Sequence, residues 1–237
     1  YAPNSLLLVL EDRSAYYIVK RIMDFTLAFI LLVLLSPVML LTAIAILICS
    51  PGPIFFKQER VGAIRQSYNG HSHWKRMTFP CYKFRTMKTD ADSSIHQAYV
   101  KAVIENDEVQ MNALQGAPTQ PRKLVNDSRI TRPGKFLRKS SIDELPQLWN
   151  VLLGDMSLVG PRPAIPYEIE MYKSWHLRRL EACPGLTGLQ QVTARCTADL
   201  DQQVLLDIEY VDNQSLWLDV KIILKTPLAI ISTTGAY

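Results

Sequence analysis

The feature that most constrains this chain is an uncharged run of about 25 residues, Phe25 to Cys49. The run exceeds the roughly 20 apolar residues that a helix needs to cross a bilayer. It is too long for a signal peptide and lacks a small-residue cleavage site. The sequence therefore predicts a membrane helix, followed by a folded domain.

A Ser36-Pro37 pair interrupts this run at its centre. Proline removes the hydrogen bond to the Val33 carbonyl, and the Ser36 hydroxyl can bond to a carbonyl freed in this way. Each half is then only about half a bilayer long. Both flanks are basic, and positive flanks prefer the cytoplasm. These residues leave two alternatives open: a plain spanning helix, and a re-entrant helix that turns back at Ser36-Pro37.

Two adjacent carboxylates, Asp143 and Glu144, form the second notable feature. Ser141 and Glu144 have capping-box spacing, and Pro146 is tolerated only in the first turn of a helix. The segment therefore predicts a helix start. The partial positive charge there keeps a carboxylate ionised and attracts phosphate. A plain helix cap is the alternative explanation of the same residues.

Basic residues recur within one domain's length of this carboxylate pair. The stretch from Tyr82 to Met87 alternates, which predicts a short strand with Lys83 and Arg85 on one face. A solvated strand face explains the same pattern. Further arginines lie among glycines and prolines that mark loops: Arg129, Arg132, Arg138, Arg162 and Arg195. Carboxylates amid several guanidinium groups suggest a divalent cation together with phosphates.

Composition narrows the range of partners. The net charge of +4 and pI of about 8.8 suit an anionic membrane surface or phosphorylated substrates. The basic clusters lack interleaved aromatic residues, so we expect no nucleic-acid partner. The four cysteines are widely spaced without a zinc pattern, which indicates reduced thiols in a cytoplasmic compartment.

The remaining chain predicts a helix-dominated α+β fold. A loop-like stretch covers Gly62 to Pro80, and a polar helical pattern runs from Asp90 to about Leu114. Amphipathic segments follow at Tyr167–Glu181, Asp199–Asn213 and Leu216–Ile231, suited to a membrane interface or to the surface of a core. We expect an N-terminal segment at 1–19, a membrane helix at 20–50 and a folded domain with a short strand pair at 51–237.

Ordered motifs along most of the chain from Lys20 resemble those of the bacterial sugar transferase family, the monotopic polyprenyl-phosphate phosphoglycosyl transferases. They are Lys20-Arg21 with Asp24, Ser36-Pro37, the stretch Ser50–Gly62, the stretch Tyr82–Met87, the carboxylate segment with Gly154–Pro163, and the segments Pro184–Val192 and Ser215–Thr226.

The resemblance implies a re-entrant membrane helix broken at Ser36-Pro37, with the catalytic domain on the cytoplasmic face of the bacterial inner membrane. It implies transfer of a sugar-1-phosphate from a nucleoside diphosphate sugar, with a UDP-sugar favoured, to polyprenyl (undecaprenyl) phosphate. This step initiates surface glycan synthesis and requires Mg²⁺. The oligomeric state stays open, with a homodimer among the options.

By the same resemblance, Asp143 is the nucleophile that forms a covalent phosphosugar intermediate. Glu144 is its partner in metal binding or acceptor activation. The residues that match phosphate-binding positions of the family are Lys83, Arg138, Arg162 and Arg195. We expect Arg85 to bind phosphate as well, because the strand pattern places it beside Lys83.

The sequence departs from the family pattern in three places. The stretches 62–80 and 90–126 look longer than in compact members, and Arg195 stands between Ala194 and Cys196, where members commonly have Gly and Asn. The last departure puts the role of Arg195 in doubt. Two other functions remain as alternatives: a non-catalytic membrane scaffold that binds anionic lipid, and a membrane phosphatase that uses water as acceptor.

Overall fold

The computed structural model describes residues 13–68, 71–89, 129–194 and 200–231, with a few isolated residues between 98 and 113. Over these ranges the protein is helix-dominated, with an antiparallel hairpin and a small parallel strand pair. The predicted fold class is confirmed. Both Arg195 and most of the helical pattern expected at Asp90–Leu114 lie outside the described residues.

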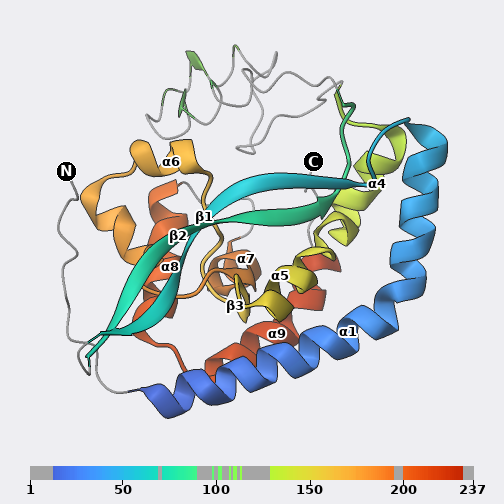
Figure 1. The fold of residues 1–237 in the computed structure, drawn as a ribbon. Coiled ribbons are helices and arrows are strands. Elements are labelled where there is room, and N and C mark those ends of the chain that lie inside the picture. Colours follow the sequence, from blue (N-terminus) through green and yellow to red (C-terminus); the bar gives the residue numbers. More distant parts are fainter. Residues whose placement is uncertain are drawn as a thin grey trace.

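The apolar run lies in helix α1, Ser14–Cys49, which begins earlier than the expected boundary at residue 20. Within the described ranges, α1 is the one helix long and apolar enough to cross a membrane. It bends sharply and follows two sides of the molecule (Figure 1). Pro37 lies inside it, and the Ser36 hydroxyl donates to the Val33 carbonyl at 2.8 Å. The sequence-based expectation for this pair is thus confirmed.

Both halves of α1 are attached to the same domain. In the first half, the carboxylate of Asp24 accepts hydrogen bonds from Ser157 Oγ at 2.7 Å and from the Leu158 amide at 3.1 Å. Both donors belong to strand β3, Ser157–Val159. In the second half, Ile46 packs in a buried cluster with Phe84 and Leu137. The bend therefore lets α1 wrap around the domain.

Strands β1, Phe55–Tyr68, and β2, His71–Phe84, form a long antiparallel hairpin with Gly62 opposite Met77. The prediction of a loop over 62–80 is therefore wrong. Glycine and proline suggested irregular structure there. The Asn69-Gly70 pair between the two strands is instead typical of a tight hairpin turn.

The rest of the domain consists of short helices and the strand pair. Its helices are α4 (Arg132–Ser140), η1 (Ile142–Glu144), α5 (Gln147–Leu153), α6 (Pro166–Glu170), η2 (Ser174–Leu180), α7 (Leu189–Thr193), α8 (Leu200–Asp212) and α9 (Leu216–Ile231). Strand β4, Gly185–Thr187, pairs in parallel with β3. The helices expected over Asp199–Asn213 and Leu216–Ile231 are confirmed, whereas Tyr167–Glu181 divides into α6 and η2.

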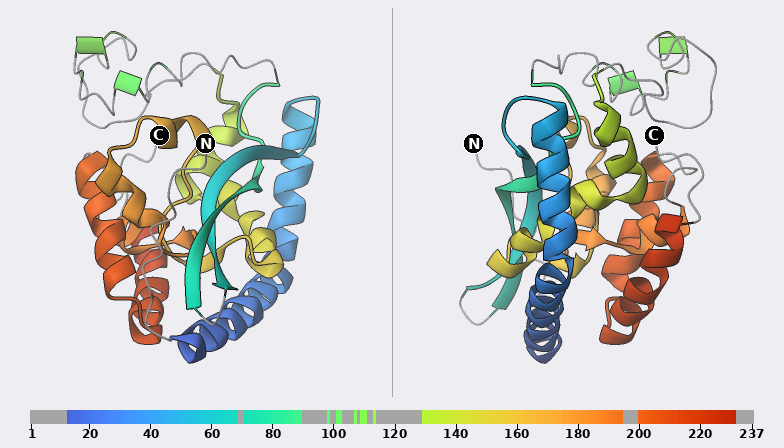
Figure 2. Two further views of the ribbon diagram at one scale, coloured as in Figure 1. Left: turned by 60° about the vertical axis from the view of Figure 1, so that its left-hand side comes forward. Right: turned by 90° about the vertical axis from the view of Figure 1, so that its right-hand side faces the viewer.

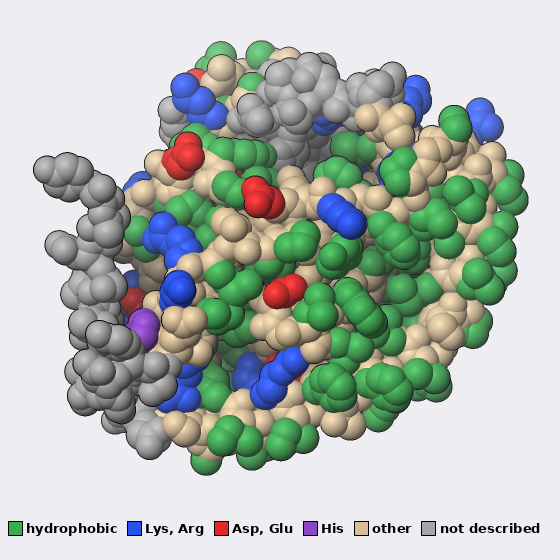
Figure 3. Space-filling view, viewed as in Figure 1, with side chains coloured by type: hydrophobic (Ala, Val, Ile, Leu, Met, Phe, Trp, Pro, Cys, Tyr) green, Lys and Arg blue, Asp and Glu red, His purple; other side chains and the backbone are tan. Residues whose placement is uncertain are grey.

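The hairpin and the pair α8–α9 lie on opposite sides of the domain (Figure 2). The main core joins these layers through Phe79, Leu148, Val159, Tyr210 and Ile222. Hydrophobic side chains gather along the rim that α1 forms (Figure 3). Helix α9 buries Asp219 and Ile222 but exposes Trp217, Leu224, Leu228 and Ile231.

Candidate active site

The two adjacent carboxylates lie on η1, the short 3₁₀ turn between α4 and α5. Ser141, just before it, has a φ of 56° and is the one non-glycine residue with positive φ among the described residues. This left-handed conformation is uncommon outside glycine and concentrates at functional sites. The predicted capping box is wrong: Ser141 ends α4, and its side chain makes no capping hydrogen bond to η1.

Apolar packing holds this turn from both sides. Ile142 and Leu145, which flank the carboxylates, pack against the cluster of Ile46, Phe84 and Leu137. The turn is therefore fixed to the second half of α1, to the end of β2 and to α4 at once. As a result, Asp143 is 8% exposed.

Asn150 on α5 sets the position of β2 beside the turn. Its amide donates to the Pro80 carbonyl at 2.8 Å, and its side-chain oxygen accepts from the Tyr82 amide at 3.1 Å. Because Asn150 is fully buried, these bonds fix the register between α5 and the strand. Lys83 then lies next to the carboxylates, with its Nζ 2.7 Å from Glu144 Oε1.

The electrostatics of Asp143 follow from this arrangement. Burial and the negative charge of Glu144 raise the pKa of Asp143 to about 6, although Lys83 and Arg138 oppose the rise. Like charges held close together, with desolvation, are the usual cause of such a shift. A carboxylate that titrates near neutral pH is a candidate for chemistry.

Glu144 also lines a hollow, together with Lys83. The lining contains three cationic side chains, those of Lys83, Arg60 and Arg162. Arg162 is exposed between two buried prolines, Pro161 and Pro163. The remaining lining residues are Cys81, Gln147, Pro163, Gly185, Leu186 and Gln191. We call this hollow the cationic pocket.

The structure therefore brings together most of the residues that the sequence indicated. Lys83, Glu144 and Arg162 share the cationic pocket, Asp143 is buried beside it, and Arg138 acts on the charge of Asp143. The Arg138 Nε also donates to Thr86 Oγ1 at 2.9 Å.

Arg85 lies elsewhere, so the expected pairing of Lys83 and Arg85 on one strand face is wrong. Strand β2 ends at Phe84, and the Arg85 guanidinium turns to the end of α1. There it donates to the Pro51 carbonyl at 2.8 Å and to the Ser50 carbonyl.

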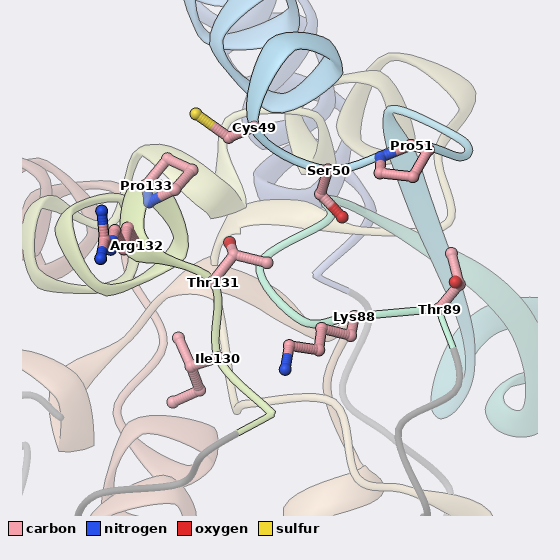
Figure 4. Close-up of a pocket in the computed structure, with 9 residues that line it drawn as sticks. All are labelled: Cys49, Ser50, Pro51, Lys88, Thr89, Ile130, Thr131, Arg132 and Pro133. Atoms are coloured by element: carbon pink, nitrogen blue, oxygen red, sulfur yellow. The ribbon is translucent and has the colours of Figure 1, made fainter.

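A wider hollow of about 700 Å³ lies next to this contact (Figure 4). Ser50 and Pro51 line it from the end of α1, and Arg132 and Pro133 line it from the start of α4. The carboxylates follow the opposite end of α4. This hollow is therefore separate from the cationic pocket.

Sequence reasoning missed Arg60 as a site residue. Its side chain is 7% exposed and donates to the Pro163 carbonyl at 3.0 Å and to Gln58 Oε1 at 2.7 Å. Burial and the nearby charge of Arg162 lower the pKa of Arg60. The available signal was the spacing of Gln58 and Arg60 by two residues, which puts both side chains on one face of a strand.

Together these features define a membrane-associated protein with an acidic pair and a cationic pocket suited to phosphorylated ligands. The chain belongs to the bacterial sugar transferase family, whose model matches residues 15–233. This confirms the resemblance inferred from the motifs.

Curated relatives are consistent with this assignment. The chain is 39% identical over 228 residues to the undecaprenyl-phosphate galactose phosphotransferase of Salmonella typhimurium, covering 96% of this chain and 43% of that protein. It is 37% identical to the exopolysaccharide production protein ExoY of Rhizobium meliloti, covering 92% and 88%. It is 35% identical to the UDP-glucose:undecaprenyl-phosphate glucose-1-phosphate transferase of Caulobacter vibrioides, covering 99% and 80%. The chain thus spans less than half of the Salmonella protein and most of the other two.

Proposed function

We propose that this protein transfers a sugar-1-phosphate from a nucleoside diphosphate sugar to undecaprenyl phosphate at the cytoplasmic face of the bacterial inner membrane. The observation that carries the proposal is the adjacent pair of the buried Asp143 and the partly exposed Glu144, beside a pocket with three cationic side chains. Relatives named as undecaprenyl-phosphate sugar transferases support the reaction class, and UDP-sugars are the donors that one of those names gives.

The chemistry assigned to Asp143 is nucleophilic attack. Its carboxylate oxygen forms a bond to the phosphorus next to the sugar, and the bond from that phosphorus to the nucleoside monophosphate breaks. In the second displacement, an oxygen of the lipid phosphate attacks the same phosphorus and releases the carboxylate. Covalent catalysis thus divides one difficult transfer between two anions into two steps.

The environment of Asp143 suits this role. With a pKa of about 6, the carboxyl is ionised at neutral pH, yet it is largely removed from water. A poorly hydrated carboxylate loses less solvation when it attacks. Lys83 and Arg162 are placed to offset the charge of the diphosphate, and Arg can bind two phosphate oxygens with one planar fork.

The carboxylate pair also fits a magnesium ion. Among the residues that the structure describes, no group of three or more His, Cys, Asp or Glu side chains comes together. Mg²⁺ needs no such group, because it is usually held by one or two carboxylates, water and substrate phosphates. Asp143 and Glu144 would supply those carboxylates. The ion would contribute charge neutralisation on the diphosphate.

We further propose that α1 enters the membrane and returns to the same face. A straight helix of 36 residues would extend roughly 54 Å and carry its ends far apart. Here Lys20, near one end, donates to the Val159 carbonyl at 3.1 Å, while the carbonyls beyond the other end accept from Arg85. Attachment of both ends to one domain favours the re-entrant arrangement over a spanning helix. The exposed apolar side chains of α9 would lie at the same membrane surface.

The test is turnover by the purified protein in lipid nanodiscs, with UDP-glucose and UDP-galactose as donors and Mg²⁺ present. We expect release of UMP that depends on added undecaprenyl phosphate. UMP release that continues without the lipid, with free sugar phosphate formed, would indicate a phosphatase. Binding of anionic vesicles with no release of a nucleoside monophosphate from any donor in a wider nucleotide-sugar panel would indicate a scaffold.

A further inference from the structure

The loop that carries Arg162 is held by an unusual set of contacts. The carbonyls of four consecutive residues, 161–164, each accept a hydrogen bond from a separate donor. These donors are the Gly185 amide to Pro161 at 2.8 Å, Arg179 Nη2 to Arg162 at 3.3 Å, Arg60 Nη1 to Pro163 at 3.0 Å and the Val61 amide to Ala164 at 2.8 Å. The backbone of the loop is therefore fixed from β4, η2 and β1.

Close packing adds to this fixation. Gly160 and Gly185 approach so closely that a Cβ atom on Gly185 would lie 2.1 Å from the Gly160 amide nitrogen. The Gly160 amide also donates to the Thr187 carbonyl at 2.9 Å. The backbone entering the loop is thus packed directly against β4 and hydrogen-bonded to it.

Two of the four donors are buried guanidinium groups. Arg60 is 7% exposed and Arg179 is 6% exposed. Arg179 also forms an ion pair with Asp207, which is 1% exposed, and donates to Tyr172 Oη at 2.9 Å. Burying charged groups costs solvation energy that an apolar side chain of similar size would not lose.

Stability alone explains these charges poorly. Among the described residues, the Nε atoms of Arg60 and Arg179 and the Asp207 Oδ1 atom are buried without a hydrogen-bond partner. If these charged groups were buried for stability alone, each of these atoms would have a hydrogen-bond partner. What both arginines share is a bond to a carbonyl in the loop that presents Arg162.

The side chain of Arg162 differs from those of its two supports. It is exposed and lines the cationic pocket together with Lys83 and Glu144. With the backbone held on either side of its Cα atom, the starting direction of the side chain is fixed. A fixed direction lowers the entropy cost of binding a phosphate.

We propose that Arg60 and Arg179 are positioning residues that hold the carbonyls of Pro163 and Arg162, so that the Arg162 guanidinium is presented to the diphosphate of the donor. This inference rests on the proposed function for the identity of the ligand. The role needs arginine in both places. A lysine donates all of its N–H bonds from a single nitrogen and lacks the planar fork, so it cannot reach the loop carbonyl and a second fixed partner in the geometry that the guanidinium allows.

A double-mutant cycle tests the inference. Arg60→Lys and Arg179→Lys are each made in the wild-type protein and in the Arg162→Ala protein, and kcat/KM for the UDP-sugar is measured. In the wild-type background we expect each change to lower kcat/KM by roughly tenfold, since misplacing a binding group by a small distance has effects of this order. In the Arg162→Ala background we expect no further loss.

The matched control is Arg178→Lys. Arg178 neighbours Arg179 in the sequence but forms an exposed ion pair with Asp212, with both side chains about half exposed. We expect unchanged kinetics in this variant. Losses of the same factor in both backgrounds would overturn the inference, because the two arginines would then act independently of Arg162. Wild-type kinetics in the single variants would overturn it as well.

Hydrogen exchange gives a readout that needs no turnover. The peptide spanning residues 160–165 should exchange faster in Arg179→Lys and Arg60→Lys than in the wild type and in Arg178→Lys. Unchanged exchange would show that neither arginine holds the loop. A wild-type protein without transferase activity would count against the proposed function, while the exchange result would still decide whether the loop is held in this way.

Discussion

Replacing Asp143 by asparagine should stabilise the protein at neutral pH while removing its activity. The carboxyl has a pKa of about 6 in the fold, against an ordinary value of 3.8. A rise of about 2 units corresponds to roughly 3 kcal/mol of free energy, at 1.36 kcal/mol per unit. Asparagine keeps the shape of the side chain and removes the buried charge.

The size of this effect depends on pH. Because the pKa is raised on folding, ionisation of Asp143 favours the unfolded chain. The destabilisation is absent below about pH 4, grows between pH 4 and pH 6, and is fully present above about pH 6. We therefore expect Asp143→Asn to raise the free energy of unfolding by up to about 3 kcal/mol at pH 8 and by close to zero at pH 4.

Thermal unfolding in detergent micelles, followed by tryptophan fluorescence without divalent cations, measures this difference. A gain of about 3 kcal/mol corresponds to a rise in Tm of roughly 6–12 °C for a chain of this size. The matched control is Asp212→Asn, an exposed aspartate paired with Arg178, which should give no comparable gain. An Asp143→Asn protein that is no more stable than wild type at pH 8, or whose gain is the same at pH 4, would refute the reasoning.

Four further outcomes are expected. Arg162→Lys keeps the charge but loses the planar fork, so kcat/KM for the donor should fall at least about tenfold; wild-type activity would show that the fork is not needed. Below about pH 6, kcat/KM should fall about tenfold per unit as Asp143 becomes protonated; a flat profile to pH 5 would contradict the role of the ionised form. Single cysteines at the exposed positions Ala15 and Lys57 should both be protected from a membrane-impermeant reagent outside intact cells; labelling of one alone would indicate a spanning helix. Replacing Pro37 by leucine should shift some molecules towards spanning, because an interior proline costs about 3 kcal/mol in a helix.

The parts of the fold that the sequence predicted have local causes. The amphipathic patterns of α8 and α9 reflect one buried face in each helix, and the hydroxyl of Ser215, just before α9, accepts a hydrogen bond from the Leu218 amide at 3.2 Å. The carbonyl that Pro37 frees is likewise satisfied by the adjacent Ser36. Residues close in sequence determine all of these features.

The errors concern contacts between distant segments. The hairpin over 62–80 depends on pairing across a turn, and its glycine and proline masked the strand pattern. Arg85 leaves the face of Lys83 because the carbonyls of Ser50 and Pro51, more than 30 residues earlier, accept its guanidinium. Such tertiary contacts override local propensity and are not visible in a single sequence.

The residues of the candidate site show the same contrast between local features, which the sequence reveals, and contacts between distant segments, which it does not. The adjacent carboxylates, and Arg162 among glycines and prolines, stood out in the sequence because their chemistry is local. Arg60 and Arg179 did not, since their significance lies in the carbonyls of residues 162 and 163 that they reach from other elements. No spacing rule connects these positions along the chain.

The most direct test of the central claim is to look for a covalent intermediate on Asp143. The wild-type protein is incubated with UDP-sugar and Mg²⁺ without undecaprenyl phosphate, quenched, and analysed by intact-mass and peptide mass spectrometry. The account predicts a mass increase equal to one sugar phosphate, located on the peptide that contains Asp143, and its loss when undecaprenyl phosphate is added. Asp143→Asn, still folded and membrane-bound, should show no adduct. An adduct on another residue, or one that persists in Asp143→Asn, would contradict the assignment of Asp143 as the nucleophile.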